Sequence, residues 1–210
     1  MPWIPTKRQA VTSRKEAPVI ASLRNPSLRI VLPLAALLAL TRYHYFASLP
    51  DATLAVFLLA GFYLRSPWWL GLFIAEAAVV DYVAITFAGV SNWCVTPAYA
   101  LLIPAYSIPW LAGRFYQRMH RWEWRTLLPL AGVVLASVTA AFVVSDGSFY
   151  LLSGYFPELS WGGYVSHFAK YYPYYLVGTS VYVAVAALLH IGVRSVRPLG
   201  AGAQARARSR

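Results

Sequence analysis

Apolar residues in this chain gather into six stretches, most of them long enough to cross a bilayer as a helix. The stretches are residues 28–47, 52–64, 67–88, 97–115, 126–145 and 173–193. A helix needs about 20 apolar residues to cross the hydrocarbon core, so the second stretch is short for a full span. Several stretches have a proline at or near the first position, where the missing N–H costs a helix nothing. The pattern predicts an all-α integral membrane protein with six transmembrane helices.

Composition supports a membrane protein over a soluble one. Of the 210 residues, 59% are apolar or aromatic and only 12% are charged, whereas soluble domains average about 25% charged residues. So few polar groups could not cover the apolar surface of a soluble fold of this size. A single cysteine excludes an internal disulfide framework, and four histidines without ligand spacing argue against a protein-held metal.

If the six stretches are transmembrane spans, nearly all basic residues lie on one side of the membrane. Sixteen of the eighteen Lys and Arg residues then fall on one side, and only Arg42 and Lys170 fall on the other. Because cytoplasmic loops collect Lys and Arg, both termini are predicted to be cytoplasmic. We therefore read the net charge of +11 as a topology signal and expect no nucleic-acid partner.

Three segments follow from this reading. Residues 1–27 form a basic cytoplasmic arm, residues 28–193 the membrane domain, and residues 194–210 an Arg-rich cytoplasmic tail. The arm and the tail are expected to be disordered and to rest on anionic lipid. The arm precedes the first apolar stretch, which is long enough to span, so no cleavable signal peptide is expected.

The short loop between the third and fourth spans carries the most distinctive side chain on the predicted outer side. Cys94 is the only thiol, and it lies just before Thr96 and Pro97, which read as an N-cap and a first helical residue. A helix N-terminus favours the thiolate, and a thiolate is a soft ligand that suits a transition metal. The alternative is a buried, inert cysteine that packs as a small apolar residue.

A second outer segment, residues 146–172, is long and carries ten aromatic or histidine side chains. Such a segment is too aromatic for disorder, and we expect a folded lid over an outward pocket. The alternative is a belt of aromatic residues at the membrane interface. Tyr164, His167 and Phe168 of this segment, together with Trp93, are candidate pocket residues.

Acidic side chains inside a span are candidates for function, and the third span contains two, Glu76 and Asp81. Asp81 lies about 12 Å below the outer loop, a depth that suits the floor of a pocket. Glu76 lies deeper and on a different face of the helix. Tyr99, at the start of the fourth span, could bring its hydroxyl to a ligand. For Asp81 the alternative is an interhelical hydrogen bond, and for Tyr99 an interfacial anchor.

These features together resemble the substrate-binding S-components of energy-coupling-factor vitamin transporters. Six spans with both ends inside, the small residues Ala35 and Ala39 one turn apart in the first span, and an outer lid carry the general likeness. Asp81, the NWCVTPAY stretch with Cys94, and Tyr99 resemble the BtuM-type cobalamin-specific S-component more closely. The likeness covers residues 28–193.

The resemblance implies a concrete function in a bacterial cytoplasmic membrane. It implies a subunit that binds cobalamin on its outer face and associates with a coupling membrane protein and a pair of ATPases. Ala35 and Ala39 would meet the coupling protein, and Cys94 would ligate the cobalt of the transported corrin, with Asp81 and Tyr99 in the pocket. It also raises thiol-assisted, reductive removal of cyanide from cyanocobalamin as a candidate activity of Cys94.

Two other functions stay open on the residues alone. An S-component for another flat vitamin would use the same aromatic walls and leave Cys94 incidental. A membrane sensor or assembly protein would bind no transported ligand and would dock a partner on the first helix.

Overall fold

The computed structural model describes residues 27–42, 49–121 and 123–208, and it describes side chains as far as residue 192. The α-helices in these ranges are α2 (Leu28–Arg42), α3 (Thr53–Tyr63), α4 (Trp68–Phe87), α5 (Leu102–Met119), α6 (Leu127–Leu152) and α7 (Trp161–Arg208). Short 3₁₀ helices η1 (Asn92–Cys94), η2 (Pro97–Leu101) and η3 (Trp124–Thr126) lie in the connections. No strand occurs within the described ranges, so this part of the chain is all-helical, as the apolar pattern predicts.

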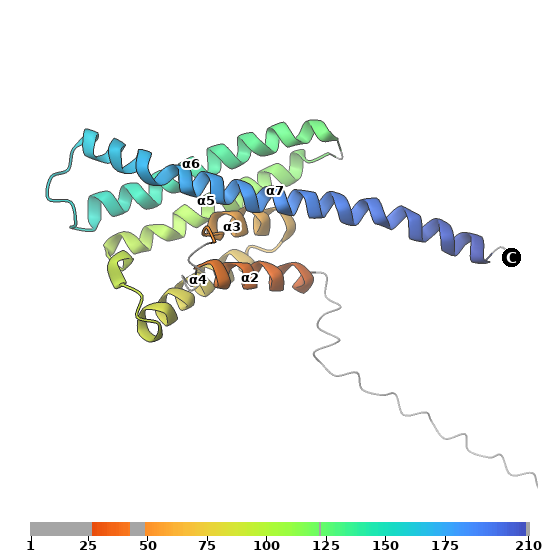
Figure 1. Cartoon of the computed structure of the whole chain (residues 1–210), viewed down its shortest axis with the longest axis horizontal. Helices are drawn as coiled ribbons and strands as arrows, with labels where there is room; N and C mark the ends of the chain where they lie inside the picture. Colours follow the sequence, from red (N-terminus) through yellow and green to blue (C-terminus); the bar gives the residue numbers. More distant parts are fainter. Residues whose placement is uncertain (1–26, 43–48, 122, 209–210) are drawn as a thin grey trace, which may run out of the picture.

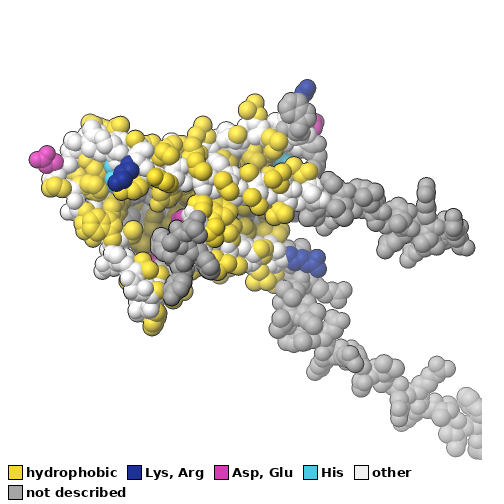
Figure 2. Space-filling view, viewed as in Figure 1, with side chains coloured by type: hydrophobic (Ala, Val, Ile, Leu, Met, Phe, Trp, Pro, Cys, Tyr) yellow, Lys and Arg dark blue, Asp and Glu magenta, His cyan; other side chains and the backbone are white. Residues whose placement is uncertain are grey.

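Three of the helices are long and apolar enough to cross a membrane: α4, α6 and the Trp161–Gly192 part of α7. Their large side chains lie open on the outside of the bundle, and Leu128 and Trp161 are each more than four-fifths exposed. Figure 2 shows this apolar covering over the bundle. A surface of this kind is suited to lipid, because the hydrocarbon core offers no water to hydrate polar groups. The chain therefore has the features of a membrane protein.

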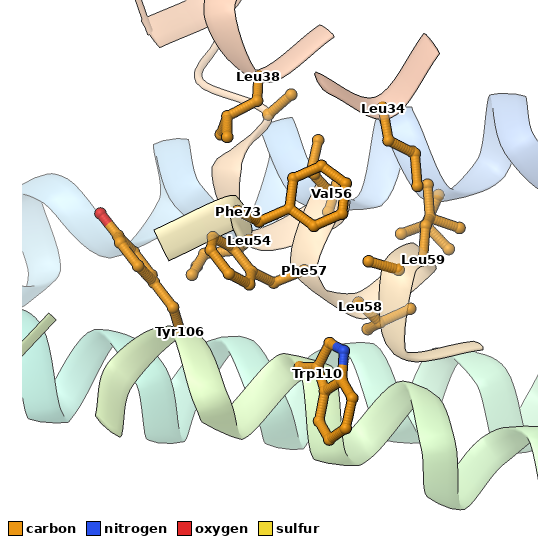
Figure 3. Packing of buried hydrophobic residues seen from close by; sticks show 14 of the residues in the cluster. Leu34, Leu38, Leu54, Val56, Phe57, Leu58, Leu59, Phe73, Tyr106 and Trp110 are labelled. Atoms are coloured by element: carbon orange, nitrogen blue, oxygen red, sulfur yellow. The ribbon is translucent and has the colours of Figure 1, made fainter. Parts of the chain in front are cut away.

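Helix α3 forms the centre of the bundle. Only 11 residues long and apolar throughout, it is nearly all buried, and it packs most extensively against α5 and also against α2, α4 and α7. Phe57 stacks on Tyr106 with ring centroids 4.8 Å apart and meets the edge of Phe73 at 6.2 Å. Figure 3 shows these rings packed together with Trp110 of α5. The second apolar stretch is thus a short core helix rather than a full-length span.

Two glycines allow α3 and α5 to approach each other closely. A Cβ atom on Gly61 would lie 1.9 Å from the carbonyl oxygen of Trp110, and one on Gly113 would lie 2.0 Å from that of Leu58. Real Cβ atoms do not come so near to backbone oxygen, so glycine is required at both positions. Small residues at helix crossings serve the same purpose in membrane proteins generally.

The connection between α6 and α7 corrects the expectation of a long outer lid. Helix α6 continues to Leu152 and α7 begins at Trp161, so only residues 153–160 lie between them (Figure 1). Pro173, expected to start the last span, lies inside α7 instead. Ring contacts one turn apart stabilise the added helix, as between Phe168 and Tyr172 at 4.7 Å. The aromatic residues expected in a lid are therefore fixed on two packed helices.

Other element boundaries also differ from expectation. The fourth stretch is divided into η2 and α5, with Pro109 inside α5 and Pro104 in its first turn. The tail, expected to be disordered, continues α7 as far as Arg208. The expected basic arm lies almost wholly outside the described residues, as does the end of the first stretch after Arg42.

Candidate functional site

A partly buried ion pair joins α2 to α4 at the end of the bundle that carries Cys94, called here the Cys94 end. Arg42, the last residue of α2, donates from Nε to Asp81 Oδ1 at 2.6 Å and from Nη2 to Asp81 Oδ2 at 2.7 Å. The side chain of Arg42 is 11% exposed and that of Asp81 22% exposed. The two parallel hydrogen bonds form the bidentate geometry that makes an arginine–carboxylate pair strong and directional.

Three further hydroxyl groups complete this network. Tyr99, in η2, donates to Asp81 Oδ2 at 2.7 Å. The Nη1 atom of Arg42 donates to Tyr106 of α5 at 2.9 Å and to Thr53 of α3 at 3.2 Å. The network therefore ties α2, α3, α4, α5 and η2 together. It brings the predicted Asp81 and Tyr99 into direct contact with each other.

The Cys94 loop leaves α4 by a tight turn. Gly89 adopts a positive φ of 68°, and the amide of Val90 donates back to the carbonyl of Ala84 at 3.2 Å. This helix ending suits glycine, which has no Cβ to clash in the left-handed region. Cys94 then ends the three-residue helix η1, where it is exposed and free of any disulfide.

The predicted helix start after Cys94 is present, with Thr96 at the N-cap of η2 and Pro97 as its first residue, but other neighbours of the thiol oppose ionisation. Partial desolvation raises the pKa of the Cys94 thiol, and the carboxylate of Asp81 raises it further, while Arg42 offsets part of the change. Thr96 stands at the N-cap of η2, but its side chain makes no capping hydrogen bond. These surroundings favour the protonated thiol over the thiolate that a helix N-terminus alone would favour.

A row of aromatic rings joins the Cys94 loop to the turn between α6 and α7. Trp93 stacks on Tyr155 with centroids 3.6 Å apart and planes 8° from parallel. Tyr155 contacts Phe149 at 5.9 Å, Phe149 contacts Phe156 at 6.2 Å, and Phe156 contacts His167 at 5.3 Å. The row forms an aromatic wall at the Cys94 end, to which η1, α6, α7 and the connection between α6 and α7 all contribute.

Tyr175 of α7 lies between the two parts of the site. Its side chain is 42% exposed, and its ring packs against Phe142 of α6 with centroids 5.0 Å apart. Figure 2 shows that the surface is hollowed on the face seen there, with an acidic side chain at the edge of the hollow.

The remaining predicted residues divide between this wall and ordinary packing. His167 Nε2 lies 3.0 Å from Asp146 Oδ1, and Tyr164 lies one turn earlier on α7. Phe168 packs edge-on against Phe142 of α6 at 5.2 Å, which is a core contact. Glu76 is half-buried on α4 and takes no part in the Arg42 network.

Ala35 and Ala39 lie half-buried on α2, and Ala35 packs against the core. Leu32, Ala36 and Leu40 are exposed on α2, as are Arg29 and Pro33. A partner that approaches α2 therefore meets exposed residues before the two alanines.

A separate cavity of about 320 Å³ lies at the opposite end of the bundle. His120 and His190 line it with centroids 5.9 Å apart, and their Nδ1 atoms lie 3.3 Å and 2.9 Å from the hydroxyls of Tyr116 and Tyr63. Among the described residues no group of three or more His, Cys, Asp or Glu side chains could hold a metal ion. This cavity is remote from the Cys94 loop.

Sequence reasoning missed Arg42, Tyr106 and Tyr175 as site residues. Arg42 was visible as one of only two basic residues on the predicted outer side, at the end of a span near an intramembrane acid. Tyr175 continues the helical face of Tyr164, Phe168 and Tyr171, a spacing hidden while residues 161–172 were read as a loop. No protein-family model matches the chain, and no curated protein matches it either.

Proposed function

We propose that the protein is the substrate-binding subunit of a vitamin-uptake transporter and that it binds cobalamin in the recess at the Cys94 end. In this proposal all six apolar helices lie within a bacterial cytoplasmic membrane, with both termini inside the cell. The observation that carries the proposal is the placement of one accessible thiol beside the Asp81–Arg42–Tyr99 network and an aromatic wall.

The chemistry of the recess suits a large planar ligand with a metal at its centre. Flat aromatic rings provide apolar contact, while a few fixed polar groups orient the ligand. Sulfur is a soft donor and suits cobalt as an axial ligand. In the proposal Cys94 occupies that axial position, and Asp81 and Tyr99, held in place by Arg42, form the polar side of the pocket.

The raised pKa of Cys94 fits a ligand-dependent thiolate. Desolvation and the Asp81 carboxylate keep the free thiol protonated, which protects it from adventitious oxidation and alkylation. A bound metal ion deprotonates a coordinating thiol outright. In the proposal the sulfur of Cys94 takes the place of cyanide on the cobalt of cyanocobalamin, and the thiol proton leaves with cyanide as hydrogen cyanide, without a change of oxidation state.

Transport requires a coupling membrane protein and two ATPases in addition to this chain. In the proposal the coupling protein contacts α2. It first meets the exposed Leu32, Ala36 and Leu40, and the small side chains of Ala35 and Ala39 then allow it to pack closely. Replacement of Ala36 by Phe should abolish uptake and leave cobalamin binding intact.

The visible absorption spectrum of the protein purified in detergent with cyanocobalamin or hydroxocobalamin tests the central step. Wild type should retain the corrinoid with cobalt bands shifted from those of the free vitamin. Cys94→Ser should lose the shift, because oxygen is a harder and weaker donor than sulfur. A colourless wild-type protein, stabilised instead by another planar vitamin in a thermal-shift screen, would overturn the cobalamin assignment. Equal spectra for wild type and Cys94→Ser would overturn cobalt ligation.

A further inference from the structure

A second polar pair lies in the wall of the recess, on α6 and α7. Asp146 Oδ1 lies 3.0 Å from His167 Nε2, and the two side chains are 11% and 19% exposed. The other carboxylate oxygen, Asp146 Oδ2, is buried and has no hydrogen-bond partner within the described part of the chain. Buried carboxylate oxygens are normally satisfied, so Oδ2 has an unused acceptor position.

The hydroxyl of Tyr164 is a second unsatisfied group in the same place. It is also buried without a hydrogen-bond partner among the residues that the structure describes. Tyr164 interacts electrostatically with Asp146, and its hydroxyl lies beside Gly147, the next residue of α6. An acceptor and a hydroxyl donor are therefore both buried without hydrogen-bond partners on neighbouring helices, in the part of the chain that the structure describes.

These two groups lie at the same end of the bundle as Cys94. The row of rings that begins at Trp93, next to Cys94, ends at His167, the partner of Asp146. The Asp81 carboxylate, by contrast, already accepts hydrogen bonds from Arg42 and Tyr99. Asp146 is thus the acidic group of the recess that keeps a free acceptor for a ligand.

We propose that Asp146 and Tyr164 bind a primary amide on the edge of the ligand, and so select amide side chains over carboxylate ones. The amide N–H donates to Asp146 Oδ2, and its carbonyl oxygen accepts from the Tyr164 hydroxyl. A carboxylate in the same place has no donor for Oδ2 and adds a like charge beside it. This inference rests on the proposed function, because the corrin ring is the flat ligand whose rim carries primary amides.

The experiment compares the affinity of purified protein for cobalamin with that for its mono-acids, in each of which one side-chain amide is hydrolysed to a carboxylate. Wild type should bind at least one mono-acid about tenfold or more weakly than cobalamin, the loss expected when a charge-assisted hydrogen bond is replaced by repulsion. Asp146→Asn should bring that ratio close to one, because the asparagine amide can donate to the carboxylate. Tyr164→Phe should weaken cobalamin itself by a few-fold without removing the discrimination.

Glu158→Gln is the matched control, since it makes the same chemical change at an exposed position between α6 and α7. It should keep the wild-type ratio. Equal ratios for wild type and Asp146→Asn would overturn the inference while the Cys94-dependent cobalt spectrum still supports the proposed function. A wild type that binds no corrinoid would overturn both.

Discussion

Loss of the Asp81 charge should destabilise the protein more than any other single change in the candidate site. Asp81→Asn keeps the shape of the side chain but leaves the Arg42 guanidinium, only 11% exposed, without its counter-charge. Removal of one partner from a buried ion pair costs about 3–5 kcal/mol. Because both side chains keep some contact with solvent, we expect about 3 kcal/mol. For a chain of this length that corresponds to a fall of roughly 6–12 °C in melting temperature.

Intrinsic tryptophan fluorescence of the detergent-solubilised protein can follow the transition, since the chain has eight tryptophans. A double-mutant cycle with Arg42→Met isolates the pair. The double variant has no unpaired charge. Its loss in free energy of unfolding should therefore be smaller than the sum of the two single-variant losses, by about 1 kcal/mol or more.

Glu76→Gln supplies the control on the same helix. Glu76 is half-buried on α4 and forms no ion pair with a residue that the structure describes, so its change should stay within about 0.5 kcal/mol. The reasoning fails if Asp81→Asn melts with wild type, or if the losses at Arg42 and Asp81 are strictly additive. Either result would mean that the ion pair does not hold α2 to α4.

Two further predictions concern packing and pH. Gly61→Ala should destabilise the protein by at least about 1–3 kcal/mol, because the new Cβ would lie 1.9 Å from the carbonyl oxygen of Trp110. Gly132→Ala is the control: no atom lies within 4 Å of its Cβ position, so it should be neutral or slightly stabilising in the same melting assay. The second prediction concerns the affinity of wild type for hydroxocobalamin divided by that of Cys94→Ser at the same pH. This ratio should rise by up to about tenfold per pH unit between pH 6 and pH 8. The reason is that cobalt must replace the proton of the Cys94 thiol, whose pKa is raised. A flat ratio across this range would exclude the thiolate as a ligand.

The apolar pattern was sufficient to predict an all-helical protein, because hydropathy is a local property of each segment. It placed the short helix over residues 52–64 to within one residue at each end of α3. It failed at residues 161–172, where tyrosine, histidine and lysine lower the hydropathy of a segment that is nonetheless helical. Those side chains stabilise α7 through ring contacts one turn apart and through contacts with α6, such as Tyr150 with Tyr164 at 5.4 Å. Helix formation there depends on a neighbour that the local pattern does not contain.

The candidate site shows the same division. Asp81 stood out because an acid inside a span is unusual, and Tyr99 because it begins the helix after the Cys94 loop; the structure brings them together at 2.7 Å. Arg42 was assigned only to a side of the membrane. Its role depends on the contact between α2 and α4, both of which also pack on α3. Pairing across helices could not be predicted from spacing along one of them.

The electrostatics of the Cys94 end set an order of events for the proposed ligand. Asp81 neutralises Arg42 through two hydrogen bonds, so little positive potential is left to stabilise a thiolate at Cys94. The thiol stays protonated until a metal takes the place of the proton. Were Asp81 replaced by Asn, Arg42 would be free to lower the pKa of Cys94, and the thiol would become more reactive toward alkylating reagents even as the fold loses stability. The same ion pair therefore holds α2 to α4 and adds to the desolvation that raises the pKa of the Cys94 thiol.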